Sequence, residues 1–222
     1  MPQPSRTVVP GAPHHVALRG NNRRVLFTRR EDYEQFLFYA SCAKQKVPID
    51  LHAAALMTNH VHLVLRPPET DSLSDFVQHL AQRYAQYRND KRGSTGKLFE
   101  RRFFSKPIVD EAQLAVTLAY VELNPIRAGI PARSPKHRWT TYWNHVGAER
   151  PALSRALWTP SPWYLDLGST DEERAARYAE WVKDCLRLGK VPADVETLEF
   201  EELRFAANVR MRPRRPDGSG AT

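Results

Sequence analysis

The stretch Leu56-Met57-Thr58-Asn59-His60-Val61-His62-Leu63-Val64-Leu65 decides how this chain folds. Successive side chains of a β-strand point to opposite faces, so His60 and His62 would share one face. The other face would carry the aliphatic residues Val61, Leu63 and Leu65. The pattern predicts a strand whose aliphatic face is covered by helices and whose two imidazoles point the other way, where they could hold one cation.

The flanking sequence predicts an α+β protein with a ferredoxin-like (RRM-like) antiparallel sheet and the element order β-α-β-β-α-β. The expected strands are residues 14–19, 49–57, 60–65 and 103–109. A capping box at Thr28-Arg29-Arg30-Glu31 should open the first helix, and Ser72 or Ser74 should cap the second. Pro107 indicates that the last strand lies at an edge of the sheet.

One more helix is expected from about Glu111 to Asn124. Its apolar stripe is separate from a polar stripe formed by Gln113, Thr117, Tyr120 and Asn124. This spacing predicts that Tyr120 lies among polar residues and outside the core. Pro125 disfavours helical backbone at the residue before it, so the helix should end at Asn124.

The length of 222 residues favours one compact domain with an appendage. Its two cysteines, Cys42 and Cys185, are far apart and form no CxxC pair, which is typical of reduced thiols. No apolar stretch approaches the length of a membrane span. We therefore expect a soluble, cytoplasmic protein that does not bind membranes.

The net charge of +8 favours a polyanionic partner. Between Arg83 and Lys106 there are eight cations and two anions. They surround the predicted loop 89–96, whose two glycines would let the backbone approach a phosphate closely. A solvated helix face that runs into a loop would explain the same charges.

Each candidate side chain also has an ordinary structural explanation. Two histidines in an HxH pair are often surface or interface residues, and a tyrosine on an amphipathic helix usually packs in a core. An asparagine before proline most often marks a helix end. His14 and His15 on the first strand could reach the same site, although ordinary burial or exposure explains them better.

Two long motifs resemble the signatures of the REP-associated tyrosine transposases, which are single-tyrosine HUH transposases. They are the 56–65 stretch and Tyr120-Val121-Glu122-Leu123-Asn124-Pro125-Ile126-Arg127-Ala128-Gly129. Shorter segments that resemble the family lie at 19–23, 96–103 and 139–142. The resemblance covers roughly residues 8 to 168, and Thr58 stands where the family commonly has proline.

The resemblance implies a metal-dependent enzyme that cleaves and rejoins single-stranded DNA beside hairpin-forming palindromic repeats. His60, His62 and Asn124 would hold Mg²⁺ or Mn²⁺, and Tyr120 would be the nucleophile that forms a 5′-phosphotyrosine. These ligands would also accept Zn²⁺, so they leave the identity of the ion open. The expected DNA-binding residues are Arg19, Asn21, Arg23, Arg83, Lys91, Arg92, Lys97, Arg101, Arg102 and Lys106.

The sequence also suggests a domain organisation, in which the end of the chain from Glu199 departs from the family pattern. Residues 8–150 would form the endonuclease domain, 151–198 a helical appendage and 199–222 a basic, disordered tail. The capping box Thr170-Asp171-Glu172-Glu173 would begin the helix of the appendage. The sequence does not distinguish a monomer from a homodimer. It also leaves open whether the tyrosine helix acts in its own subunit or in the partner subunit.

Two other classes of function stay in consideration. The first is a non-catalytic module of RRM-like fold that binds single-stranded nucleic acid. Such modules stack bases on aromatic side chains of central strands, and residues 60–65 contain none. The second is a zinc hydrolase built on the HxH pair, which would require further His, Asp or Cys ligands.

Overall fold

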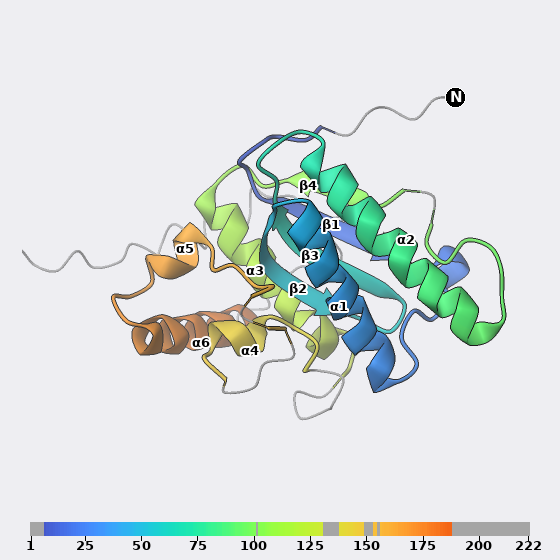
Figure 1. The fold of residues 1–222 in the computed structure, drawn as a ribbon. Helices are drawn as coiled ribbons and strands as arrows, with labels where there is room; N and C mark the ends of the chain where they lie inside the picture. Colours follow the sequence, from blue (N-terminus) through green and yellow to red (C-terminus); the bar gives the residue numbers. More distant parts are fainter. Residues whose placement is uncertain (1–6, 101, 131–137, 149–152, 155, 188–222) are drawn as a thin grey trace, which may run out of the picture.

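A four-stranded antiparallel sheet forms the centre of the molecule, and helices cover both of its faces (Figure 1). The computed structural model describes residues 7–100, 102–130, 138–148, 153–154 and 156–187. The strands are β1 (His14–Arg19), β2 (Asp50–Leu56), β3 (His60–Arg66) and β4 (Phe104–Pro107), and they are arranged in the order β2-β3-β1-β4. The predicted α+β class and the antiparallel sheet are therefore confirmed.

The helices alternate with these strands and then follow them. A short 3-10 helix, η1 (Asn21–Arg23), comes after β1, and α1 (Arg30–Lys46) connects to β2. Helix α2 (Ser72–Arg92) precedes β4, and α3 (Glu111–Arg127) follows it. The remaining helices are α4 (Tyr142–His145), α5 (Pro162–Leu165) and α6 (Asp171–Arg187). Among the described residues, no helix is both long enough and apolar enough to cross a membrane.

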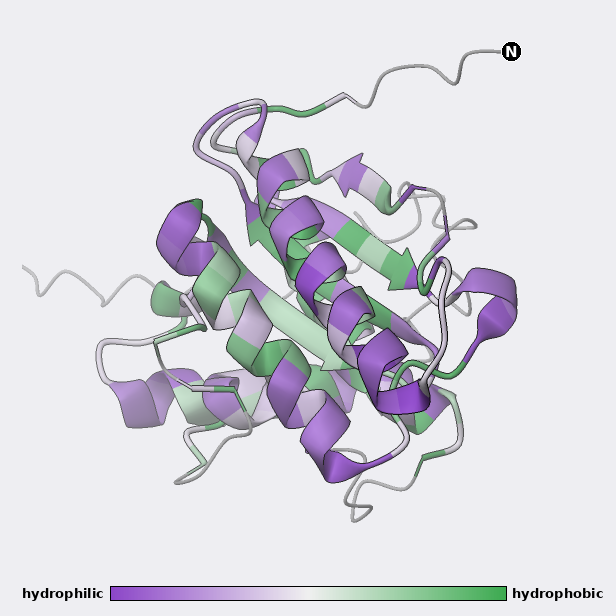
Figure 2. Cartoon of the chain, turned by 45° about the vertical axis from the view of Figure 1, so that its right-hand side comes forward, coloured by the Kyte–Doolittle hydropathy of each residue, from purple (hydrophilic) through white to green (hydrophobic). Residues whose placement is uncertain are grey.

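Two hydrophobic clusters lie on opposite faces of the sheet. Helices α1 and α2 bury Val61, Leu63 and Leu65, while their outward surfaces are mainly hydrophilic (Figure 2). Helix α3 covers the other face, where Val64 packs with residues of α3, α5 and α6. The predicted division of the His60–Leu65 strand into an aliphatic face and a histidine face is confirmed.

The C-terminal helices share a core with α3. Trp163 of α5 and Tyr178 of α6 belong to the second cluster. The predicted capping of α6 is confirmed, since the backbone N–H of Glu173 donates to Thr170 Oγ1 at 3.2 Å. The proposed domain boundary at residue 150 stays a prediction, and the predicted tail 199–222 lies outside the described residues.

The predicted bounds of several elements were wrong. Helix α2 continues to Arg92, so the first four residues of the expected loop 89–96 form its last turn, and strand β4 is shorter than the expected 103–109. Helix α3 continues through Pro125 to Arg127. A proline costs a helix one backbone donor, but the N–H of Ala128 still donates to Asn124 O at 2.9 Å. The last turn therefore survives the proline.

The predicted caps of α1 and α2 were also wrong. The carboxylate that caps α1 belongs to Asp32, whose Oδ2 accepts hydrogen bonds from the backbone N–H groups of Thr28 and Arg29. Glu31, which the sequence favoured, is exposed. Helix α2 is preceded by Asp71, and neither Ser72 nor Ser74 caps it because both lie inside the helix.

Asp32 also joins α1 to α2. Its fully buried carboxylate lies 2.6 Å from the guanidinium of Arg88, which is 1% exposed, and 2.7 Å from Lys91 Nζ. Burial opposes ionisation of Asp32, but hydrogen bonds from Lys91, Thr28 and Arg29 outweigh it and lower the pKa of this carboxyl group. The first helical layer is therefore held together by a buried ion pair.

We predict that Asp32→Ala lowers the free energy of unfolding by about 3–5 kcal/mol, because it leaves the Arg88 cation buried without its partner. Since the folded pKa of Asp32 lies below its ordinary value of 3.8, wild type should lose this contribution only as the pH falls below that value. Urea unfolding at pH 7 and at pH 3 measures both effects. The control is Glu34→Ala, which breaks the exposed Arg30–Glu34 pair and should cost less than about 1 kcal/mol. Equal losses in the two variants would contradict the prediction.

Candidate active site

Three histidines gather on the sheet face that α3 covers. His60 and His62 lie on β3 with ring centroids 4.8 Å apart and ring planes nearly perpendicular. His15, from the neighbouring strand β1, stacks on His62 and places its Nε2 3.0 Å from His62 Nδ1. From the sequence, ordinary burial or exposure explained His15 best, but the structure brings it into contact with His62, a predicted metal ligand.

Hydrogen bonds to Nδ1 orient both imidazoles of the HxH pair. Asn59 Oδ1 accepts from His60 Nδ1 at 2.8 Å, and His15 engages His62 Nδ1. Among the described residues, the Nε2 atoms of His60 and His62 have no hydrogen-bond partner. Metal-binding histidines are typically held in this way, with one ring nitrogen oriented by a neighbour and the other left for the ion.

Burial keeps these imidazoles neutral at pH 7. Desolvation, assisted by the nearby Arg19 cation, lowers the pKa of His60 to about 4. Desolvation also lowers the pKa of His15 to about 4 and that of His62 well below its usual value. A histidine must be neutral to bind a metal ion. These imidazoles would therefore not have to lose a proton before they bind a cation.

Tyr120 of α3 packs directly against these histidines. Its ring centroid lies 5.7 Å from that of His62 and 5.8 Å from that of His15, in edge-on geometry. The guanidinium of Arg127 lies 5.3 Å from the centre of the same ring. Tyr120 is 3% exposed and belongs to the second hydrophobic cluster, so the prediction that it lies outside the core was wrong. The cause is that α3 is covered on most sides: its polar stripe meets the histidines, and other sides meet α5 and α6.

Asn124 lies one helical turn after Tyr120 and is half-buried. Its side-chain Nδ2 donates to the backbone oxygen of Tyr120 at 3.2 Å, inside a helix that does not end there. Within the described parts of the chain, no group of three or more His, Cys, Asp or Glu side chains could hold a metal ion. A cation at this site would therefore depend on two imidazoles, supplemented by amide, water or substrate oxygens.

The segment after β1 supports the histidine pair. The N–H of Gly20 donates to Asn59 O at 2.8 Å, next to His60. A Cβ atom at Gly20 would lie 2.1 Å from Arg24 O, so only glycine fits this close approach. The segment 19–23, which resembles the family, thus has a structural role: it holds the backbone next to His60.

The predicted DNA-binding residues lie on several elements. Arg19 lies opposite His60 in the β1–β3 register, and Lys106 lies opposite His15 in the β1–β4 register. Arg83, Lys91 and Arg92 lie on α2, over the other sheet face, and Lys91 is already engaged by Asp32. Asn21 and Arg23 form part of η1, Lys97 and Arg102 are exposed, and Arg101 lies outside the described residues.

Sequence reasoning missed Glu122, which lies between Tyr120 and Asn124. Its fully buried carboxylate accepts from Thr141 Oγ1 at 2.6 Å, from His145 Nδ1 at 2.7 Å and from Tyr178 Oη at 2.6 Å. Burial and the Glu122 charge raise the pKa of Tyr178 well above its usual value, so its hydroxyl remains a donor. The one sequence signal was an acid within the apolar run of α3.

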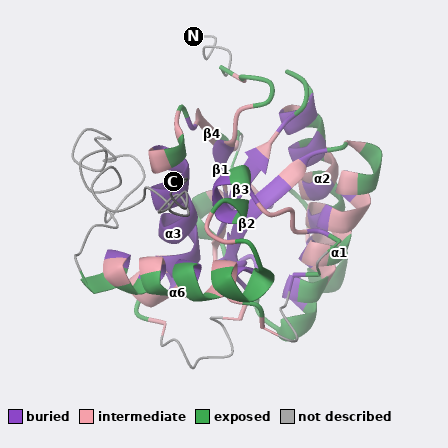
Figure 3. Cartoon of the chain, turned by 90° about the vertical axis from the view of Figure 1, so that its left-hand side faces the viewer, coloured by how far each residue is buried: buried purple, intermediate pink, exposed green. Residues whose placement is uncertain are grey.

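The Glu122 cluster fixes α3 to the C-terminal helices. His145 belongs to α4 and stacks on Tyr178 of α6 with ring centroids 4.2 Å apart. Figure 3 shows the buried α3 beside the sheet and the more exposed α6 running across below it. The helix that carries Tyr120 is therefore held from both sides.

Comparison with known proteins agrees with this geometry. A family model described as "Transposase IS200 like" matches residues 9–124, which is more than half of the chain. The chain belongs to the IS200-like transposase family. No curated protein matches this transposase.

Two solved structures are similar to this transposase. A REP-associated tyrosine transposase bound to a REP hairpin has 19% sequence identity and a TM-score of 0.55, over 72% of this transposase and 93% of that chain. It shows that the fold is shared. A putative transposase from Deinococcus radiodurans R1 matches at 20% identity over 54% of this transposase and 95% of that chain. Its TM-score of 0.38 is too low to support an argument.

We predict that Glu122→Ala lowers the free energy of unfolding of this transposase by at least about 3 kcal/mol, because it leaves buried donors on Thr141, His145 and Tyr178 without an acceptor. Glu122→Gln keeps one acceptor oxygen and should cost less. Chemical denaturation measures both. Glu111→Ala, on the exposed first turn of the same helix, is the control and should change stability by about 0.5 kcal/mol or less. A Glu122→Ala protein as stable as this control would refute the role of the cluster.

Proposed function

We propose that this transposase is a REP-associated, single-tyrosine enzyme that cleaves and rejoins single-stranded DNA next to hairpin-forming palindromic repeats. The observation that carries the proposal is the packing of the Tyr120 ring against His62, a member of an HxH pair some sixty residues away in the sequence. The strand order β2-β3-β1-β4 also agrees with a ferredoxin-like sheet followed by a tyrosine-bearing helix. The structural neighbour that carries a REP hairpin supports the choice of substrate.

His60 and His62, with Asn124, would hold Mg²⁺ or Mn²⁺ at this site. When bound, such an ion would offset negative charge on the non-bridging oxygens of the scissile phosphate. The donor set fits, because both imidazoles are neutral and offer Nε2. His15 and Asn59 act as positioning residues that hold the two rings.

Tyr120 provides the nucleophile. A bond forms between its phenol oxygen and phosphorus while the bond from phosphorus to the 3′ oxygen breaks. The phenol proton is released, and the departing 3′ oxygen takes up a proton to become a hydroxyl. Arg127, 5.3 Å from the Tyr120 ring, favours the negative charge that develops on the phenol oxygen. A second 3′-hydroxyl can reverse the step and rejoin strands, because the phosphotyrosyl bond is a phosphodiester like the one that was broken.

The DNA backbone would contact basic side chains on both sides of the histidine site. Arg19 and Lys106 are placed opposite His60 and His15 on the sheet, and we expect Arg23, Lys97 and Arg102 to contact the DNA backbone as well. Arg83 and Arg92, on α2 over the other sheet face, and Arg101, outside the described residues, remain predicted contacts. Helix α3 lies on its own sheet, and Glu122 ties it to α4 and α6 of the same chain. This favours a Tyr120 that acts within its own subunit.

Both alternative functions are weaker. A module that binds single strands on an open sheet face would need that face exposed, whereas α3 covers the histidine face of β2 and β3. A zinc hydrolase would need a third protein ligand of the usual kinds, and the described residues provide no such group.

We predict that Tyr120→Phe abolishes covalent attachment to DNA and leaves hairpin affinity within about twofold, because it removes only the attacking oxygen. The measurement is gel detection of a protein–DNA adduct after incubation with Mn²⁺ and a hairpin-bearing single strand. The control is Tyr39→Phe on α1, which should form the adduct like wild type. Attachment that persists in Tyr120→Phe would assign the nucleophile to another tyrosine and overturn the mechanism.

We also predict that His60→Ala and His62→Ala each reduce adduct formation by more than about 100-fold, and that EDTA abolishes it in wild type. Asn124→Ala should be milder, because water can replace one neutral oxygen ligand. Asn59→Ala should weaken metal affinity by about 10–100-fold, so that added Mn²⁺ restores its activity. A Mn²⁺ titration of adduct formation tests this, with His79→Ala on α2 as the control. Full activity in EDTA would exclude the metal site.

A further inference from the structure

On the histidine face of the sheet, α3 packs mainly on β2 and β3, and strands β1 and β4 extend beyond it. In this part of the sheet, Ala17 on β1 is the register partner of both His62 on β3 and Phe104 on β4. Directly opposed residues of an antiparallel sheet lie on the same face, so these three side chains form a row across the sheet. Ala17 is half-buried, and the Phe104 side chain is 38% exposed.

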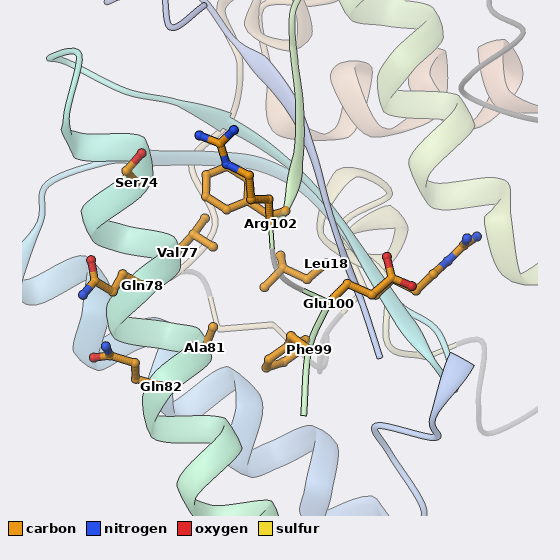
Figure 4. A pocket seen from close by; sticks show the side chains of 11 residues that line it. Leu18, Ser74, Val77, Gln78, Ala81, Gln82, Phe99, Glu100 and Arg102 are labelled. Carbon is orange, nitrogen blue, oxygen red and sulfur yellow. The ribbon is translucent and has the colours of Figure 1, made fainter. Parts of the chain in front are cut away.

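This row is separate from the cavity on the other face of β1. Leu18, the residue after Ala17, lines that cavity, which lies between α2 and residues 99–103 (Figure 4). Successive residues of a strand alternate between the two faces, so the sheet itself separates the cavity from Phe104. Phe104 therefore lies on the same side of the sheet as His62.

A single imidazole connects Phe104 to the candidate active site. The ring centroid of Phe104 lies 5.8 Å from that of His15, and His15 stacks on His62. The Tyr120 ring contacts the same imidazole, also at 5.8 Å. Tyr120 comes from α3, over β2 and β3, whereas Phe104 comes from β4 at the far edge of the sheet. Phe104 is thus an exposed aromatic ring beside the site at which we propose that a phosphate binds.

We propose that Phe104 stacks on the base of the nucleotide whose 3′ oxygen leaves when Tyr120 attacks. The inference rests on the proposed function and adds a substrate contact to it. In phosphoryl transfer the attacking and leaving oxygens lie roughly in line, on opposite sides of the phosphorus. Since Tyr120 approaches from α3, the leaving oxygen points toward β1 and β4, where Phe104 lies. Aromatic side chains bind single-stranded DNA by stacking on the faces of its bases.

The charges beside Phe104 suit a nucleotide better than an apolar partner. Lys106 is two residues after Phe104 on β4 and therefore shares its face. Arg19 is two residues after Ala17 on β1 and shares the face in the same way. Desolvation lowers the pKa of His15, and the Lys106 charge lowers it further, as expected for an ammonium group close to the site. A base stacked on Phe104 would have cations near the phosphates on either side of it.

Stacking predicts two properties of this contact. Every base has a π face, so Phe104 would require a base at this position without selecting which one. After cleavage, the same contact would hold the strand that carries the free 3′-hydroxyl beside the phosphotyrosine. It would thereby favour rejoining, the reverse of the cleavage step, over loss of that strand.

The test is a scan of single abasic sites along a hairpin-bearing single strand, with affinity measured in EDTA so that no cleavage is required. In wild type, an abasic site at the stacked position should weaken binding by about 5- to 100-fold. In Phe104→Leu, which keeps an apolar side chain on β4 but no aromatic face, this penalty should disappear. Phe104→Trp should retain it, which misfolding could not imitate. The control is Phe38→Ala on α1, which removes an aromatic side chain that is 58% exposed and should leave the wild-type penalty.

Mapping the Tyr120 adduct on the intact strand shows which linkage is cleaved. The inference requires that the Phe104-dependent position is the nucleotide on the 5′ side of that linkage. A scan that is the same in wild type and Phe104→Leu, or a Phe104-dependent position elsewhere in the strand, overturns the inference and leaves the chemistry of Tyr120 standing. If wild type forms no adduct, the proposed function fails and the assignment of Phe104 to a leaving nucleotide fails with it, whereas a Phe104-dependent penalty would still demonstrate the stacking contact.

Discussion

The packing of α3 against the sheet and its attachment to α4 and α6 are the constraint on which the candidate site depends. Helix α3 places Tyr120 against His62 and His15 on one side, while Glu122 accepts hydrogen bonds from Thr141, His145 and Tyr178 on another. A buried carboxylate is costly unless its acceptor sites are occupied, so the position of α3 is strongly determined. Tyr120, the proposed nucleophile, is therefore carried by a helix that cannot easily slide or rotate relative to the histidines.

The same physical device stabilises the other face of the sheet. There Asp32 joins α1 to α2 through Arg88 and Lys91, as Glu122 joins α3 to α4 and α6. Each acid is fully buried and has several donors. The two clusters hold the helical layers at defined positions above and below the sheet, and apolar packing alone would specify those positions less uniquely.

Burial has a different consequence for the histidines. The same desolvation that makes an unpaired charge costly keeps His15, His60 and His62 neutral at pH 7, which is the state in which imidazole binds a cation. Hydrogen bonds at Nδ1 then leave Nε2 for that role.

The sequence by itself determined the strands, the order of the elements and the face on which His60 and His62 lie, because these follow from local periodicity. Tertiary structure alone decided that Asp32 rather than Glu31 caps α1, that α3 continues through Pro125 and that Tyr120 is buried. It also decided that Glu122 meets His145 and Tyr178. These contacts join residues that are distant in the chain. A periodic pattern predicts which face of an element a residue lies on, but it does not identify the residue that packs against it.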